Sequence, residues 1–466
     1  MNKKVQIAKY VVADFLSASL VWALFNVLRY YLIAYFLGYG SLTSYLTYKV
    51  VWEVQLLVPF YWLVLYYFSG YYNKSFGKSR LGEFFSTLVC VLLGVVLLFF
   101  IVILDDLPSS FHIYYELFFS LLGMQFFFTY LPRLLITQNG LKKIKNREWA
   151  VNALIIGVGP KAKKIADHLY DTGYNISGFV AEDDKAKLAI SPEQMLGTLD
   201  NLPDIVPAHQ IGEIVVAVES EDSDERVRIL YLLYRYNYPI KILADKSNML
   251  AKVKIKTIRG LPLIDVTDNN FLELEKNIKL WLDRFIAALA MILLSPAFIY
   301  IVWRVKKDSP GPIIFRQERI GYRGKPFMMY KFRTMYEGSE DNGPLLAVEN
   351  DSRITPFGHL MRKYRLDELP QFWNVLKGDM SLVGPRPERR YFIDQIVKKT
   401  PYYYLLHNVR PGVTSLGMVK YGYASNVDEM IERLEYDMLY YENMSLAFDM
   451  TILIYTVKTV ITGKGI

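Results

Sequence analysis

The sequence contains one cysteine, Cys90, in 466 residues. A single thiol excludes an intrachain disulfide and a zinc site built from several cysteines. The chain also lacks internal repeats and low-complexity tracts. Its first apolar run is too long for a cleavable signal peptide and has no clear small-residue cleavage site, so we expect that run to be retained.

Charge is too scarce for a typical soluble enzyme and too abundant for a protein lying wholly in a membrane. Hydrophobic residues make up 52% of the chain and charged residues 21%. We therefore expect one part in the bilayer and one part in water. The net charge of +8 suits anionic lipid headgroups or phosphorylated substrates. Nucleic acid is not an expected partner, because much of this charge flanks apolar segments.

Four apolar stretches in the first third are each long enough to cross a hydrocarbon core of about 30 Å. They are Tyr10–Leu32, Val50–Tyr71, Phe84–Leu104 and Tyr114–Ile136. Basic residues lie before the first stretch, between the second and third, and after the fourth: Lys3, Lys4, Lys9, Lys74, Lys78, Arg80, Arg133, Lys142, Lys143, Lys145 and Arg147. The loop between the third and fourth carries Asp105 and Asp106 instead. The pattern places all basic clusters on the cytoplasmic side. The alternative is four buried helices in a soluble bundle.

Between about Val151 and Ile264 the pattern changes to short apolar strands that alternate with helical segments, which predicts a parallel α/β sheet. The turn Gly157-x-Gly159 follows the first strand and precedes a helix. In that context backbone N–H groups can bind a pyrophosphate, although Pro160 removes one donor. The alternative is a Rossmann-like scaffold in which Gly157 and Gly159 serve only a tight turn.

A fifth apolar run, Ile278–Trp303, contains Ser295 and Pro296 near its middle. Proline removes a helical hydrogen bond and clashes with the preceding turn, so we expect a sharp kink. Basic residues flank both ends: Lys276, Lys279, Arg284, Arg304, Lys306 and Lys307. Because both ends are basic, we expect the run to enter the bilayer and return to the cytoplasmic side. The alternative is an ordinary fifth span.

The stretch from Arg365 to Glu388 carries the densest set of chemically useful residues. Asp367 and Glu368 are adjacent and can flank one phosphate or one metal ion. A carboxylate can attack phosphorus and form an acyl phosphate, which divides a difficult transfer into two easier steps. Gly384-Pro-Arg386-Pro presents Arg386 rigidly, and arginine suits bidentate phosphate contact.

Further cations lie outside this stretch. Lys331 and Arg333 alternate with other residues as on one face of a strand, Arg353 supplies another cation, and Arg410 lies in an expected turn. Several cations beside paired acids predict a site for a nucleotide diphosphate.

From about Ile278 to its end, the chain resembles the bacterial polyprenyl-phosphate hexose-1-phosphate transferases, which initiate capsule, exopolysaccharide and O-antigen assembly. The motifs are Lys331-Phe-Arg-Thr-Met335, Leu366-Asp-Glu-Leu-Pro-Gln371, the segment from Asn374 to Pro387, and Arg410-Pro-Gly-Val-Thr414. After Thr414 many members continue with a different pattern from Ser415-Leu-Gly-Met, so the resemblance does not transfer the identity of the sugar. Glucose and galactose are the leading expectations.

The resemblance implies roles for these residues. Asp367 would be the nucleophile, and Glu368 would assist by metal binding or proton handling, with Mg²⁺ bound at Asp367 and Glu368. Arg353, Arg386 and Arg410 would hold phosphates, in addition to Lys331 and Arg333, which the strand alternation predicts as paired phosphate ligands. The implied substrates are a UDP-hexose and undecaprenyl phosphate, and the family suggests a homodimer and a re-entrant helix at Ser295 and Pro296.

The expected fold is therefore a membrane α-helical bundle (1–140), a Rossmann-like α/β domain (141–265) and a mixed α/β catalytic domain with a re-entrant membrane helix (266–466). We expect it in the bacterial inner membrane with its catalytic part in the cytoplasm. Two alternatives remain. One is a membrane-tethered, NAD-dependent nucleotide-sugar epimerase or dehydratase, which would need acid–base residues after the Gly-rich turn. The other is an assembly scaffold without activity.

Overall fold

The computed structural model describes residues 3–73, 78, 80–103, 110–183, 188–220, 222–243, 256–258, 261–269, 271–339 and 351–463. The chain divides into two compact units. The first comprises Met1–Ala150 with Asp171–Tyr174, and the second comprises Val151–Tyr170 with Asn175–Ile466. The α/β segment and the C-terminal segment thus belong to one unit.

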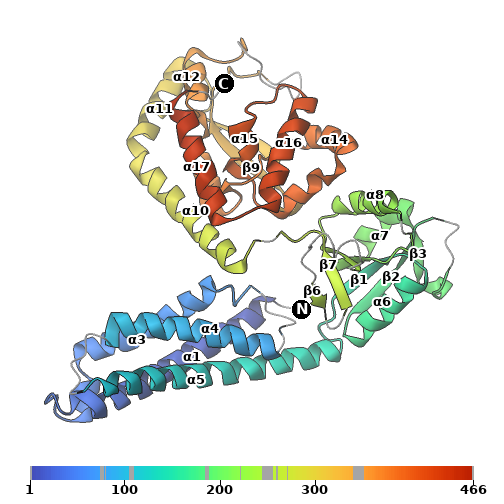
Figure 1. Cartoon of the computed structure of the whole chain (residues 1–466). Coiled ribbons are helices and arrows are strands. Elements are labelled where there is room, and N and C mark those ends of the chain that lie inside the picture. Colours follow the sequence, from blue (N-terminus) through green and yellow to red (C-terminus); the bar gives the residue numbers. More distant parts are fainter. Residues whose placement is uncertain are drawn as a thin grey trace. The chain divides into compact units, whose positions relative to one another are not determined.

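The first unit is a bundle of four long helices, in which α1 packs against α3 and α5, and α4 packs against α5 (Figure 1). Its elements are α1 (Lys3–Arg29), η1 (Tyr30–Ala34), α2 (Leu42–Leu46), α3 (Lys49–Phe68), α4 (Arg80–Leu98), η2 (Phe99–Ile103) and α5 (His112–Lys145). The four predicted spans coincide with helices long and apolar enough to cross a membrane.

The bundle exposes apolar side chains on its outside, and a few charged side chains are buried within its largely apolar core. Val12, Leu16 and Leu20 of α1 are exposed, whereas Asp14 on the same helix is 1% exposed. A soluble helix bundle would instead expose charged side chains to water. The distribution seen here is the one expected of helices surrounded by lipid.

The expectation that Arg133 belongs to the basic cluster after the fourth span is wrong. Its side chain is fully buried within the bundle. Its Nε and Nη2 donate to the two carboxylate oxygens of Asp14 at 2.7 and 2.8 Å, and its Nη1 donates to Thr87 at 3.2 Å. Tyr72 donates to the same carboxylate at 2.8 Å. Of the other charges used to orient the spans, Lys74, Asp105 and Asp106 lie outside the described residues.

The second unit begins with a seven-stranded sheet in the order β3-β2-β1-β4-β5-β7-β6. Its strands are β1 (Asn152–Ile156), β2 (Asn175–Ala181), β3 (Met195–Thr198), β4 (Glu213–Val216), β5 (Ile240–Leu243), β6 (Lys256–Ile258) and β7 (Leu261–Asp265). Helices α6 (Pro160–Asp171), α7 (Leu202–Ala208) and α8 (Ser223–Tyr234) connect them, with short 3₁₀ turns η3 (Pro192–Gln194) and η4 (Leu199–Asn201).

The expected parallel pairing holds only for the first five strands, because β7 pairs antiparallel with both β5 and β6. The sheet is therefore mixed. The rest of the α/β prediction, strands that alternate with helices, is confirmed.

The C-terminal segment opens with α10 (Glu273–Leu293) and α11 (Ser295–Asp308), which are bent by 64° at the break between them. Ser295 Oγ donates to the carbonyl of Ile292 at 2.8 Å, and Pro296 lies in the first turn of α11. The predicted kink at Ser295 and Pro296 is thus present.

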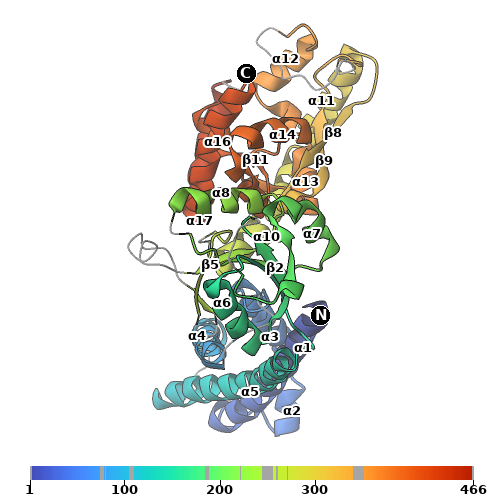
Figure 2. The same cartoon turned by 90° about the vertical axis from the view of Figure 1, so that its right-hand side faces the viewer.

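The remaining elements surround the hairpin of β8 (Ile314–Ile320) and β9 (Pro326–Phe332), which Figure 2 shows beside α13. They are η5 (Tyr322–Gly324), α12 (Pro356–Lys363), η6 (Leu366–Glu368), α13 (Gln371–Lys377), β10 (Ser381–Val383), α14 (Arg390–Lys399), η7 (Pro401–Asn408), β11 (Gly412–Thr414), α15 (Leu416–Lys420), α16 (Val427–Glu442) and α17 (Leu446–Ile461). Helices α12, α15, α16 and α17 are preceded by the N-cap residues Thr355, Ser415, Asn426 and Ser445, whose side chains each accept a backbone N–H from the first turn.

Candidate active site

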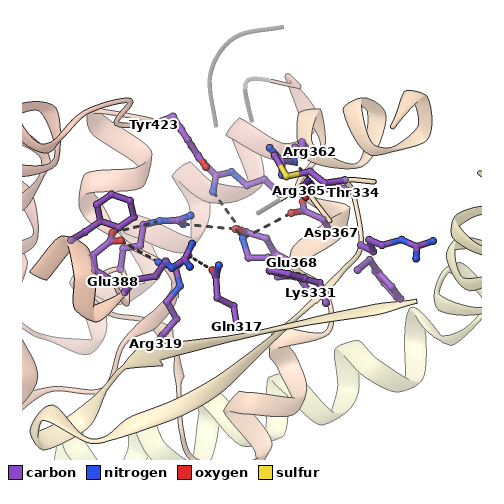
Figure 3. A pocket seen from close by; sticks show the side chains of 18 of the residues that line it. Gln317, Arg319, Lys331, Thr334, Arg362, Arg365, Asp367, Glu368, Glu388 and Tyr423 are labelled. Carbon is purple, nitrogen blue, oxygen red and sulfur yellow. Dashed lines mark hydrogen bonds and ion pairs between the residues drawn. The ribbon is translucent and has the colours of Figure 1, made fainter. Parts of the chain in front are cut away.

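A cavity of about 350 Å³ lies between the β8–β9 hairpin, α12 and η6, on one side, and the segment Gly384–Arg389 with α16 on the other. Gly384 lets this segment run close to the next strand, because a side chain there would collide with the backbone of Arg410 and Gly412. Figure 3 shows how charged side chains from these elements converge. The cavity therefore collects residues from widely separated parts of the sequence.

Asp367 and Glu368 lie on the short 3₁₀ turn η6, and both are buried, at 7% and 8% exposure. The turn follows Arg365, whose backbone is left-handed, with φ 52° and ψ 25°. A non-glycine residue in this region is strained by about 1–2 kcal/mol.

Cations surround Glu368 more closely than Asp367. Lys331 Nζ donates to Glu368 Oε1 at 2.8 Å, whereas it lies 3.9 Å from Asp367 Oδ2. Arg365 Nη1 lies 3.5 Å from Glu368 Oε2, and Arg386 Nη1 lies 3.8 Å from Glu368 Oε1. In Figure 3 both acids and Lys331 point toward one another.

The two neighbouring acids consequently titrate differently. Burial alone would raise the pKa of Glu368, but Lys331, Arg365 and Arg386 outweigh it and hold this pKa at about 2. Burial raises the pKa of Asp367, and Lys331 only partly offsets the rise. Glu368 is thus a permanent anion tied to its cations. Asp367 is the carboxylate less engaged by cations and therefore better able to attack an electrophile.

Three arginines lining the cavity have buried guanidinium nitrogens without a hydrogen-bond partner among the described residues: Nε of Arg319, Nε and Nη1 of Arg333, and Nη1 of Arg362. Buried donors cost free energy when unpaired, so such nitrogens favour an anionic ligand. Arg333 is anchored by Ser309, whose carbonyl and hydroxyl accept from Nη2 at 2.6 and 3.0 Å.

The structure brings Lys331, Arg333 and Arg386 into the cavity with both acids, but not the other two predicted phosphate ligands. Arg353 does not line the cavity, and its Nε donates to Asp351 at 2.8 Å. Arg410 does not line it either. Its Nε donates to the carbonyl of Gly378 at 3.0 Å, and its guanidinium lies 5.4 Å from the ring of Tyr322.

Sequence reasoning missed a second set of charges at the far end of the cavity. Glu388 accepts from Arg433 at 2.6 Å and from Arg319 at 3.2 Å, and Arg386 Nε is 3.9 Å from it. Arg319 also donates to Gln317 at 2.6 Å. Glu388 is the last residue of the motif stretch that contains Asp367, and this position could have identified it as a site residue. Arg319 and Arg433 lie in segments without a motif, so nothing comparable in the sequence indicated them.

The two adjacent carboxylates fit Mg²⁺ in part. Mg²⁺ is typically bound by one or two carboxylates together with substrate phosphates and water. Asp367 and Glu368 can supply the carboxylates, of which Asp367 is the less committed to cations. Among the described residues there is no group of three or more His, Cys, Asp or Glu placed to hold a metal ion. A diphosphate would have to complete the coordination.

The Gly-rich turn holds a carboxylate of the protein itself. Glu219 Oε1 accepts from the backbone N–H of Lys161 at 2.6 Å, in the first turn of α6. A Cβ on Gly159 would come 2.6 Å from Cγ of Glu219. Gly157 has a φ of 121°, and a Cβ there would collide with the backbone carbonyl of Ala217. An internal anion thus occupies the helix N-terminus, where a pyrophosphate would otherwise be favoured. The arrangement supports the tight-turn alternative for Gly157 and Gly159.

Comparison with known proteins identifies two family matches. Residues 274–463 match the family described as bacterial sugar transferase, and residues 67–244 match a CoA-binding domain. The first match contains every residue of the cavity described above.

Individual relatives point the same way. A UDP-N-acetylgalactosamine-undecaprenyl-phosphate N-acetylgalactosaminephosphotransferase of Aeromonas hydrophila is 44% identical over 188 residues, covering 40% of this chain and 44% of the relative. A UDP-glucose:undecaprenyl-phosphate glucose-1-phosphate transferase of Klebsiella pneumoniae is 33% identical over 57% of this chain and 55% of the relative. A UDP-galactose-lipid carrier transferase of Erwinia amylovora is 31% identical over 70% of this chain and 72% of the relative. The matched segments thus span about half of the first two relatives.

Proposed function

Because the chain belongs to the bacterial family of undecaprenyl-phosphate sugar phosphotransferases, we propose that it transfers a hexose-1-phosphate from a UDP-sugar to undecaprenyl phosphate and releases UMP. The observation that carries this proposal is the pair Asp367–Glu368, buried in a cavity lined by arginines with unpaired donors. The three relatives named above act on different sugars by name, so the hexose stays open.

In the first step, an Asp367 carboxylate oxygen attacks the sugar-linked phosphorus of the UDP-sugar. The bond from that phosphorus to the bridging oxygen breaks, UMP leaves with the bond's electrons, and an aspartyl phosphosugar remains. In the second step, a phosphate oxygen of undecaprenyl phosphate attacks the same phosphorus. The Asp367 carboxylate then leaves, and the product is an undecaprenyl diphosphate sugar.

The surrounding residues position the phosphates. Lys331 of β9, Arg333 directly after it and Arg386 all line the cavity, and Glu368 holds Lys331 and Arg386 in place. A Mg²⁺ ion bound at Asp367, Glu368 and the diphosphate would offset the charge of the phosphates. We further propose that the bent helix α10–α11 is re-entrant and that the cavity opens to the cytoplasm, where UDP-sugars are found. The reaction would be the first membrane step of a surface polysaccharide pathway.

The test is UMP release by the purified protein with undecaprenyl phosphate and a panel of UDP-sugars. We expect one or a few UDP-hexoses to support release, and mass spectrometry of the trapped protein to find a phosphohexose on the peptide that contains Asp367. The variant Asp367→Asn keeps the size of the side chain and should lose turnover while remaining folded. Substantial residual turnover in Asp367→Asn would refute the role of the nucleophile, and release of no UMP from any sugar would refute the reaction.

A further inference from the structure

A second cleft, of about 760 Å³, lies between α8 on one side and α14 with η7 on the other. No residue lines both this cleft and the cavity of Figure 3. Tyr402 of η7 packs against Tyr231 of α8, with ring centroids 6.1 Å apart, and so holds the two walls together. Cavities of this volume are typical of small-molecule sites.

The walls of the cleft are net positive. Four cations line it against two carboxylates: Arg228, Arg235, Arg390 and Lys398 against Asp224 and Asp394. One cation from α14 is already compensated, since Arg390 Nε lies 3.1 Å from Asp394. Arg228 of α8 and Arg235, the residue at the C-terminal cap of this helix, stand two helical turns apart, at a spacing that places them on the same face. The walls therefore favour an anion, and arginine favours a phosphate.

The floor of the cleft carries buried polar atoms without partners. His407 is 5% exposed, and neither of its ring nitrogens has a hydrogen-bond partner in the described part of the chain. The same holds for the side-chain carbonyl of Asn237. Burial, together with Arg390, lowers the pKa of His407 to about 4, so the ring is neutral near pH 7. A neutral imidazole offers one donor and one acceptor, and the amide carbonyl offers a second acceptor.

Aromatic and apolar side chains fill the space between the charged walls and this floor. Tyr231 and Tyr404 line the cleft together with Val227, Val397 and Pro401. The ring of Tyr404 lies 5.8 Å from that of His407, nearly edge to face. A flat ligand with N–H and nitrogen acceptor atoms on its edge suits this lining, because it can contact the aromatic rings and pair with the polar atoms below.

We propose that this cleft is a binding site for a nucleoside monophosphate, with its base toward Asn237 and His407 and its phosphate among Arg228, Arg235 and Lys398. The ligand would contact both α8, from the α/β sheet, and α14, from the C-terminal segment. The site is separate from the one proposed to transfer sugar phosphate.

The test is calorimetric titration of the full-length protein in lipid nanodiscs with AMP, GMP, CMP and UMP, and with inorganic phosphate. At least one nucleotide should bind, and Arg235→Glu and His407→Phe should each weaken that binding about tenfold or more. Lys164→Glu, an exposed cation on α6 outside the cleft, should bind as the wild type does. Arg235 is exposed, so its variant is expected to fold even if His407→Phe does not.

Three outcomes would overturn the proposal. These are binding of no nucleotide at about 1 mM, equal binding by wild type and Arg235→Glu, and inorganic phosphate binding as tightly as any nucleotide. If inorganic phosphate binds as tightly as the nucleotides, the cleft is a site for anions and does not recognise a nucleoside. The titration needs no turnover, so its result is independent of the UMP-release assay.

Discussion

The ammonium group of Lys331 donates a 2.8 Å hydrogen bond to Glu368 and stands 3.9 Å from Asp367. One cation is thereby shared by two adjacent buried carboxylates. Without it, the two negative charges would repel each other at a buried position, and the pKa of at least one acid would rise. Lys331 therefore lowers the pKa of both carboxylates, although for Asp367 it only partly offsets the effect of burial, and it is also a candidate phosphate ligand.

Replacing Lys331 by Met should lower the rate of UMP release by about 100-fold, a loss of roughly 3 kcal/mol in the transition state. The matched control is Lys325→Met, since Lys325 is exposed and lies before the same strand, outside the cavity. The control should keep its rate within about twofold. Equal rates for the two variants would show that the position of Lys331 has no special role.

Arg365 allows a second test, because its backbone is strained and its guanidinium faces Glu368. Glycine adopts φ > 0 freely, so Arg365→Gly should change the stability by less than about 1 kcal/mol, since relief of strain offsets the greater entropy of the unfolded chain. We nevertheless expect a loss of activity of about 10-fold or more, because one of the three cations that hold Glu368 is gone.

Arg323 is the matched control for Arg365. It is also a left-handed arginine, with φ 57°, but it lies exposed on η5 and does not line the active-site cavity. Arg323→Gly should match Arg365→Gly in melting temperature and the wild type in UMP release. If both glycine variants keep full activity, the guanidinium of Arg365 is not needed and its backbone alone shapes the turn.

The sequence motifs predicted a set of cavity-lining residues, but not the direction in which each side chain points. Asp367, Glu368, Lys331, Arg333 and Arg386 all reach the cavity. A flexible arginine can instead be captured by the nearest acceptor, and this happens to Arg353 at Asp351, two residues away. Arg410 is similarly held by a backbone carbonyl. Such local competition cannot be derived from a motif.

Long apolar runs predicted the helices well, since a run of about 20 residues has few other solutions in a membrane. Short strands were harder. The strand β7 contains Pro262, which argues against a strand in the sequence. It pairs antiparallel with β5, and this choice of partner is made by the tertiary fold. The sequence also did not reveal the pairing of Arg133 with Asp14, because these residues are 119 positions apart.

That buried pair should stabilise the helix bundle only while both partners remain. Arg133→Met would leave the Asp14 carboxylate buried without its cation, which typically costs about 3–5 kcal/mol. We expect a clear fall in the melting temperature of the protein in detergent. The double variant Asp14→Asn, Arg133→Met should recover part of the loss, and Lys142→Met, an exposed change on the same helix, should have little effect. If Arg133→Met melts like Lys142→Met, the pair contributes nothing to stability.

The last prediction concerns the bent helix α10–α11. Basic residues lie near both of its ends, and its middle exposes large apolar side chains, among them Ile292, Leu293 and Ile299. The 64° bend at Leu294 shortens the depth that the two helices can reach. We expect the helix to enter the membrane from the cytoplasm and return there, which keeps Asp367 on the side of the UDP-sugar.

The single cysteine makes this testable by thiol labelling. In a Cys90→Ala background, Leu272→Cys before α10 and Lys306→Cys near the end of α11 introduce exposed thiols on both sides of the bend. Both should resist a membrane-impermeant reagent in intact cells and react after lysis. Thr47→Cys, exposed between α1 and α3, should react in intact cells, because one span separates it from the cytoplasmic N-terminal lysines. Labelling of the Lys306→Cys site in intact cells would instead mean that α10–α11 crosses the membrane, and Asp367 could not then meet a cytoplasmic UDP-sugar.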